Sequence, residues 1–204
     1  MASDQRSASG RPAWANRHYR VVAFDLWSYY SRCLYIPVIR IQIDFDRHLD
    51  EAVLAEAFEQ SCVTFPLIAC VFDTTPPIRP RWTPRREAAR EILQVVETRA
   101  DTLREDEIQR VFAGSPDISK GPQLCAFLVR DSMRDSLCLT INHMLCDAAG
   151  FKQYLREVAR LYSRIVAGLD PSPAPFDSQR SILPVLKRFT PLDWLLPPPS
   201  ALGP

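Results

Sequence analysis

The sequence lacks the features that mark a membrane protein or a secreted protein. It contains no run of about 18 consecutive apolar residues, the length that a transmembrane helix needs. Its first twenty residues are polar and basic and have no apolar core of the kind found in signal peptides. These absences predict a cytoplasmic protein with no membrane span.

An excess of charge of either sign is also missing. The 25 Lys and Arg residues nearly cancel the 24 Asp and Glu residues, which gives a formal net charge of +1 at pH 7. Domains that bind nucleic acids or anionic membranes usually carry a marked positive excess. We therefore expect no nucleic-acid partner.

Metal-site and disulfide patterns are absent as well. The six cysteines form no C-x-x-C pair and no metal-ligand spacing with a histidine. Several lie within apolar runs, where a free thiol packs as a small hydrophobic side chain. The sequence thus predicts reduced cysteines and no metal centre.

Hydrophobic periodicity predicts an α/β (mixed α+β) fold, with a mixed sheet flanked by helices. The alternation from Val38 to Phe45 indicates a half-buried strand, and Asp50 is a typical N-cap for the helix that follows. Further strands are expected at 67–72, 92–97, 123–130 and 137–142, a short helix at 103–112 and a long amphipathic helix at 151–166. The four prolines between Asp73 and Pro84 predict a loop.

Three regions are expected along the chain. Residues 1–18 are predicted to be a flexible arm and residues 19–170 a folded lobe. Residues 171–204 hold nine of the eighteen prolines and are predicted to be a linker or tail. A group of aromatic residues at positions 27–35 is expected to pack in the core or against another lobe.

The segment from Leu139 to Gly150 carries the most informative pattern. His143 and Asp147 lie four residues apart, where a strand is predicted to end and the long helix to begin. If the strand continues through His143, its ring emerges partly desolvated, which favours the neutral imidazole that a general base requires. Asp147 is placed to cap the helix. A structural histidine and a plain helix cap would give the same pattern, so the spacing leaves both interpretations open.

Cys146 lies beside Asp147 and invites comparison with a nucleophile paired with His143. Its position at the entrance to a helix favours a packed, unreactive thiol.

The segment resembles the H-x-x-x-D signature of the condensation-domain superfamily of acyltransferases, which includes condensation domains of nonribosomal peptide synthetases, wax ester synthases and alcohol acetyltransferases. The resemblance covers roughly residues 20–170. It includes the opening segment and first strand at 24–45, the helix and Pro-Leu turn within 49–67, the Gly-Pro-Gln-Leu entry at 121–124 and the final helix. It implies a chloramphenicol-acetyltransferase-like lobe.

The resemblance also implies a reaction. His143 would remove a proton from a hydroxyl or amine acceptor, which attacks an acyl thioester of coenzyme A or of a phosphopantetheinyl carrier protein. Asp147 would orient the loop through a charged partner, and no metal or permanently bound cofactor is needed. Asn142 occupies the place where many condensation domains have a second histidine. Asn142 and Gly150 are candidate substrate-binding residues.

Family members with this layout run to about twice this length, as two similar lobes with a tunnel between them. The resemblance therefore implies an N-terminal half, with a second lobe supplied by a homo-oligomer or a partner chain. The alternative is a non-catalytic half-lobe that binds a carrier protein or a partner subunit.

Overall fold

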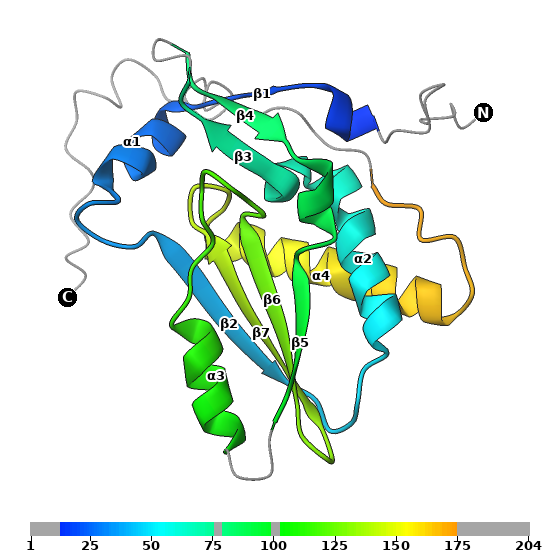
Figure 1. Cartoon of the computed structure of the whole chain (residues 1–204). Coiled ribbons are helices and arrows are strands. Elements are labelled where there is room, and N and C mark those ends of the chain that lie inside the picture. Colours follow the sequence, from blue (N-terminus) through cyan, green and yellow to red (C-terminus); the bar gives the residue numbers. More distant parts are fainter. Residues whose placement is uncertain (1–12, 76–78, 99–102, 175–204) are drawn as a thin grey trace, which may run out of the picture.

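The larger of two β-sheets forms the centre of the molecule (Figure 1). The computed structural model describes residues 13–75, 79–98 and 103–174. Within them the strand order of this sheet is β2-β7-β6-β5, with β5 and β6 parallel and the other pairs antiparallel. The strands are β2 (Val38–Asp44), β5 (Leu93–Glu97), β6 (Leu124–Arg130) and β7 (Asp135–Asn142).

A smaller antiparallel sheet lies beyond one end of the larger one and has the order β1-β4-β3 (Figure 1). Short 3-10 helices η1, η2 and η3 connect to it. Their bounds are η1 (Ala13–Asn16), β1 (Tyr19–Arg20), η2 (Pro66–Ala69), β3 (Cys70–Asp73), β4 (Arg81–Pro84) and η3 (Arg86–Ala89).

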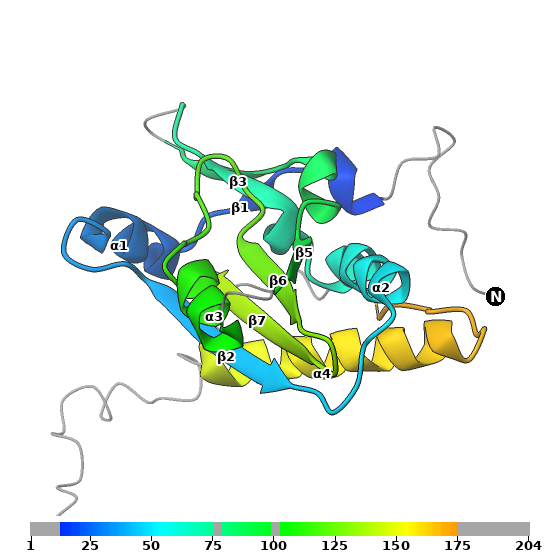
Figure 2. The same cartoon turned by 60° about the horizontal axis from the view of Figure 1, so that its bottom comes forward.

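Helices cover both faces of the larger sheet (Figure 2). Helices α2 and α4 pack side by side on one face, over a core that includes Phe58, Leu139 and Tyr154. Helix α3 covers the other face, where Ile108 and Val111 meet Val129. The helices are α1 (Ala23–Ser31), α2 (Glu51–Thr64), α3 (Arg104–Phe112) and α4 (Ala148–Val166). None of the helices in these described segments is both long and apolar enough to cross a membrane.

Local sequence signals explain most of these elements. The Asp50 carboxylate accepts a hydrogen bond from the Val53 N–H at 3.0 Å, which confirms the predicted N-cap of α2. Apolar positions along α4 recur every three or four residues, so one stripe of the helix is buried. Gly168 has a φ of +66° just past the end of α4, a backbone conformation that favours glycine.

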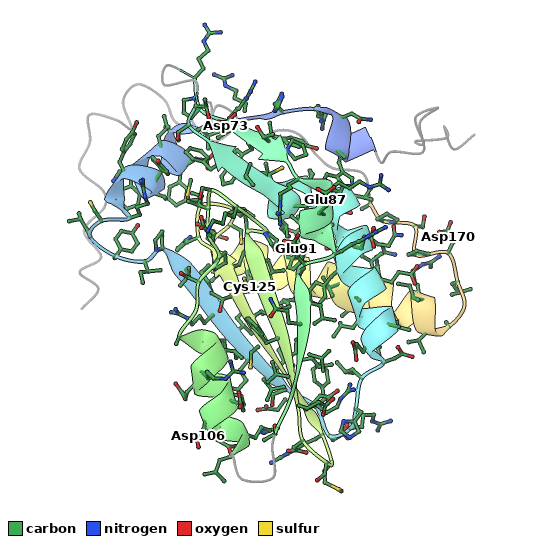
Figure 3. All side chains as sticks on the ribbon, viewed as in Figure 1. Asp73, Glu87, Glu91, Asp106, Cys125 and Asp170 are labelled. Atoms are coloured by element: carbon green, nitrogen blue, oxygen red, sulfur yellow. The ribbon has the colours of Figure 1, made fainter. Side chains whose placement is uncertain are left out.

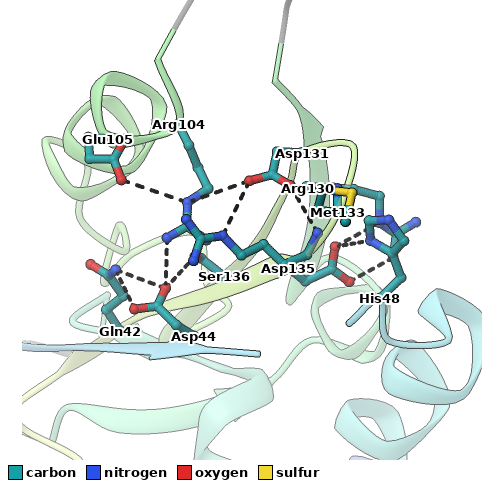
Figure 4. A network of polar contacts seen from close by, with 11 residues as sticks. Gln42, Asp44, His48, Arg104, Glu105, Arg130, Asp131, Met133, Asp135 and Ser136 are labelled. Carbon is teal, nitrogen blue, oxygen red and sulfur yellow. Dashed lines mark hydrogen bonds and ion pairs between the residues drawn. The ribbon is translucent and has the colours of Figure 1, made fainter. Parts of the chain in front are cut away.

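A buried ion-pair network holds the end of the sheet where β7 begins (Figure 4). The fully buried Asp135 carboxylate accepts hydrogen bonds from Arg130 Nε at 2.9 Å and from the Leu49 N–H at 2.8 Å, and it lies 2.9 Å from His48 Nδ1. Beside it, Arg104 forms an ion pair with Asp44 at 3.4 Å. The hairpin of β6 and β7 is thereby tied to the turn between β2 and α2.

The structure corrects two sequence predictions around the smaller sheet. The loop expected between Asp73 and Pro84 contains β4, because Trp82 is fully buried and its indole N–H donates to Asp25 Oδ2 at 2.9 Å. Pro84 is tolerated since it is the last residue of the strand. The strand expected at 67–72 begins as the 3-10 helix η2 and becomes extended only at Cys70.

Near the N-terminus the structure adds two helical elements. Helix α1 was not predicted, and residues 13–16, assigned by sequence to the flexible arm, form η1 with Trp14 packed in the core. Residues 1–12 of that arm and residues 175–204 of the predicted tail lie outside the described residues.

Candidate functional site

His143 begins the turn that joins β7 to α4. Strand β7 ends one residue earlier, at Asn142, where the sequence predicts its end, so the strand does not continue through His143. The backbone N–H of His143 donates to the Pro37 carbonyl at 2.8 Å, which fixes the turn against the entry to β2. The sequence prediction that His143 stands at the junction of a strand and the long helix is confirmed.

The His143 ring is partly buried and one of its nitrogens is unpaired. Its Nδ1 is shielded from solvent and has no hydrogen-bond partner among the described residues. The ring lies edge-on to Phe24 of α1, with 6.1 Å between ring centroids. A buried nitrogen without a partner carries a desolvation cost of about 1–3 kcal/mol. No described group therefore fixes the orientation of the ring through Nδ1.

Two buried amides hold the backbone on either side of His143. Asn142 Nδ2 donates to Gln123 Oε1 at 3.1 Å, and Asn142 Oδ1 accepts from the Met144 N–H at 3.1 Å. Gln123 in turn donates to the carbonyls of Cys70 and Ile118. The end of β7 is thus joined through Gln123 to the smaller sheet, next to the turn that bears His143.

Asp147 is an exposed N-cap of α4. Its Oδ1 accepts from the Gly150 N–H at 2.8 Å, as the sequence predicts. The charged partner that the family resemblance implies is not present: no basic side chain of the described segments lies within ion-pair distance of Asp147. The hydrogen bond that the structure gives the Asp147 side chain is thus the cap of α4.

Gly150 has a packing role at the start of α4. A Cβ at this position would lie 2.8 Å from the Cys146 Cβ, closer than side-chain atoms approach. Its N–H is already used by the Asp147 cap. The cap and the close packing each favour a glycine at this position.

Two substitutions of Asp147 distinguish the role of its capping oxygen from the role of its negative charge. We expect Asp147→Ala to lower the free energy of unfolding by about 1 kcal/mol, whereas Asp147→Asn, which keeps a capping oxygen, changes it by a few tenths. Urea unfolding of both variants measures this difference. Equal losses in the two variants would contradict the capping role and point to a need for the negative charge.

The described residues around His143 do not favour a cysteine nucleophile or a metal site. Burial, with a further contribution from the Asp147 charge, raises the pKa of the Cys146 thiol to about 12, so it stays protonated near neutral pH. No group of three His, Cys, Asp or Glu side chains in the described segments could hold a metal ion. Figure 3 shows Asp73, Asp106 and Asp170 at separate edges of the molecule.

A pocket of about 560 Å³ opens beside the end of β7. Asn142 and Met144, the neighbours of His143 in sequence, line it together with Ser28 and Arg32 of the α1 region and Ile118. Of the two predicted substrate-binding residues, Asn142 lines this pocket and Gly150 does not. The pocket was not predicted, because its walls come from segments far apart in the sequence.

A patch of exposed apolar side chains surrounds α1 and the segment that leads to β2. We call it the aromatic face, and it consists of Phe24, Trp27, Tyr30, Leu34, Tyr35 and Ile36. Each of these side chains is at least 43% exposed, and Leu34 reaches 83%. Contiguous apolar surface of this kind usually marks a binding site.

No protein-family model and no curated protein sequence matches this chain. Solved structures do match its fold. The epimerization domain from the third module of tyrocidine synthetase B has a TM-score of 0.67 at 13% identity, over 78% of this chain and 37% of that domain. The first condensation domain of the calcium-dependent antibiotic synthetase, in complex with a substrate analogue, has a TM-score of 0.69 at 16% identity, over 85% of this chain and 44% of that one.

A third similar structure is a mutant of the starter condensation domain of rhizomide synthetase in complex with C8-CoA. Its TM-score is 0.67 at 18% identity, over 84% of this chain and 40% of that one. The chain thus spans less than half the length of the structures it matches. At these identities the likeness establishes architecture: the chain has the condensation-domain fold, over less than half of such a domain.

Proposed function

We propose that this chain transfers an acyl group from a thioester of coenzyme A or of a carrier protein to a hydroxyl or amine. The observation that carries the proposal is the placement of His143. Its partly buried ring follows the last residue of a central strand, and its turn is held by Pro37 and Asn142. A pocket lined by its sequence neighbours Asn142 and Met144 opens beside the end of that strand. The fold shared with condensation domains supports thioester chemistry as the reaction class.

His143 acts as the general base in this proposal. It takes the proton of the acceptor hydroxyl or amine as the acceptor attacks the thioester carbonyl, so that a C–O or C–N bond forms. The C–S bond then breaks, and the proton passes to the departing thiolate. Asp147 maintains the turn by capping α4, and the Gln123–Asn142 pair fixes the backbone around the histidine.

The proposal is tested by release of free thiol from acyl-CoA in the presence of alcohols and amines. We expect acceptor-dependent thiol release above the uncatalysed rate, with ester or amide as the product. If the folded chain released thiol at the same rate with and without every acceptor, direct acyl transfer would be contradicted.

The aromatic face favours a second candidate function, a half-lobe whose task is to bind another protein. Because contiguous apolar surface is usually covered by a partner and most oligomers are symmetric assemblies of one chain, we propose that a second copy of this chain covers the face. Such a copy would also enclose the surroundings of His143, since Phe24 belongs to the face and contacts the histidine ring.

Light scattering of the purified chain tests this association. We expect a dimer for the wild-type chain and a monomer for Trp27→Lys, because a lysine on the face would bury an unpaired charge on association. Lys152→Ala on the exposed side of α4 is the control and should remain a dimer. A monomeric wild-type chain at high concentration would contradict the second-copy proposal.

A further inference from the structure

The wall of the pocket beside β7 carries a serine hydroxyl. Ser28 lies on α1, is 1% exposed and lines the pocket, and no hydrogen bond joins its side chain to another described residue. A hydroxyl can both donate and accept, so a polar group of a ligand at this wall can hydrogen-bond to Ser28. Asn142, 5% exposed, also lines the pocket, with its amide already engaged by Gln123 and the Met144 N–H.

A single charged side chain lines the same pocket. Arg32 is exposed, which places it toward the solvent side. Its guanidinium lies 3.7 Å from the centroid of the Tyr29 ring, and Nη1 donates to the Tyr29 carbonyl at 2.5 Å. No described carboxylate lies within ion-pair distance of Arg32, and the pocket lining includes no acidic residue. The remaining N–H groups of this oriented guanidinium suit an anionic oxygen pair.

The wall between these two polar groups is mainly apolar. Ile36, Pro37, Ile118 and Met144 line it. The volume of about 560 Å³ lies within the range that small-molecule sites occupy. The pocket therefore combines an anion-binding group on its solvent side, an apolar middle and a hydrogen-bonding inner end.

We propose that this pocket binds a free monocarboxylate that has an apolar body and a hydroxyl or amine at its far end. The carboxylate pairs with Arg32, the body lies along the apolar wall, and the hydroxyl or amine bonds to Ser28. His143 is not part of the pocket lining, but its sequence neighbours Asn142 and Met144 are, and Ser28 lies one helical turn after Phe24, the residue in contact with the His143 ring. In this proposal the far end of the ligand extends from Ser28 toward the histidine. As the assignment of an acceptor, this inference rests on the proposed acyl transfer.

The proposal specifies the transfer step. The hydroxyl of the bound carboxylate loses its proton to His143 as its oxygen attacks the thioester carbonyl. A C–O bond forms, the C–S bond breaks, and the thiol leaves with the proton. The product is an acyloxy acid, and its carboxylate remains free because it is held at the opposite end of the pocket.

Calorimetric titration with 8-hydroxyoctanoate, its methyl ester and octanoate tests the binding. We expect Arg32→Ala to raise the Kd for 8-hydroxyoctanoate about tenfold and to leave the Kd of the ester unchanged, because the ester has no charge to pair. Ser28→Ala should raise the Kd for 8-hydroxyoctanoate about fivefold and leave the Kd for octanoate unchanged. Arg156→Ala, an exposed arginine of α4 outside the pocket, is the matched control and should bind like the wild type.

The binding proposal is overturned if 8-hydroxyoctanoate fails to bind, if it binds no better than its ester, or if Arg32→Ala and Arg156→Ala give the same Kd. Adding octanoyl-CoA distinguishes a failure of the binding proposal from a failure of the proposed reaction. If binding depends on Arg32 but no thiol is released, acyl transfer is contradicted and the carboxylate site is retained. If the wild type and Arg32→Ala release thiol at the same rate, the carboxylate assignment is overturned and the reaction is retained.

Discussion

Replacing His143 by alanine is expected to lower the rate of acyl transfer by about 10²–10⁴-fold, the usual contribution of a positioned general base. The protein should remain folded, because the ring is only partly buried and its Nδ1 has no described partner to lose. We expect the free energy of unfolding to change by less than about 1 kcal/mol. Thiol release and urea unfolding on the same preparations measure both effects.

His18→Ala is the control for this variant. His18 is exposed and its Nδ1 lies 3.1 Å from Thr83 Oγ1, so it offers a polar contact away from the turn that bears His143. We expect this variant to keep wild-type turnover. If His143→Ala kept full turnover, or lost it only through unfolding, the histidine would be structural and the second function, protein binding through the aromatic face, would gain support.

Replacing Asp135 by asparagine is expected to lower the free energy of unfolding by about 3 kcal/mol. The variant leaves the Arg130 guanidinium, whose side chain is 19% exposed, without its carboxylate, and removing one member of a buried pair is far more costly than losing a surface pair. Asp46→Asn is the matched control, because Asp46 is 84% exposed and pairs with Arg47 at the surface. Chemical denaturation at pH 7 measures both variants. Equal stability of the two would contradict the role of the buried network.

The lowered pKa of the Asp135 carboxyl makes the free energy of unfolding depend on pH. Burial acts to raise the pKa of Asp135, but hydrogen bonds from Arg130, His48 and the Leu49 N–H outweigh it and hold that pKa below its usual value. Its contribution is therefore complete above the unfolded-state pKa of about 4 and is lost as the pH falls through the lower folded-state value. We expect the free energy of unfolding of Asp135→Asn to fall less steeply with decreasing pH than that of the wild type. If the two free energies fell with the same slope below pH 4, the lowered pKa of Asp135 would be contradicted.

The elements predicted from sequence are those whose signal is local. Strand β2 alternates with a period of two, and α2 begins at an aspartate cap, so both could be read from neighbouring residues. Helix α1 could not, because its burial is the reverse of the usual pattern. Its polar residues Asp25 and Ser28 are buried, whereas its aromatic residues Phe24, Trp27 and Tyr30 are exposed. The prolines near β4 concealed a strand that the burial of Trp82 stabilises.

The same distinction applies to the site. His143 and Asp147 lie within one turn and its cap, so a short segment of sequence contains both, and its resemblance to a family signature singled them out. The Gln123–Asn142 pair depends on the pairing of β6 with β7, and the pocket depends on α1 lying beside the end of β7. Such contacts form only when distant segments meet, and no pattern of neighbouring residues encodes them.

The central claim, that His143 drives direct transfer from a thioester, is tested most directly by a single-turnover experiment. The folded chain is mixed in excess with octanoyl-CoA and 8-hydroxyoctanoate, and mass spectrometry follows the ester and any acylated protein. The account predicts ester formed in step with free coenzyme A, no acyl-protein intermediate, and no ester with His143→Ala. An acylated protein that precedes the ester, or equal ester yields from the wild type and His143→Ala, would contradict it.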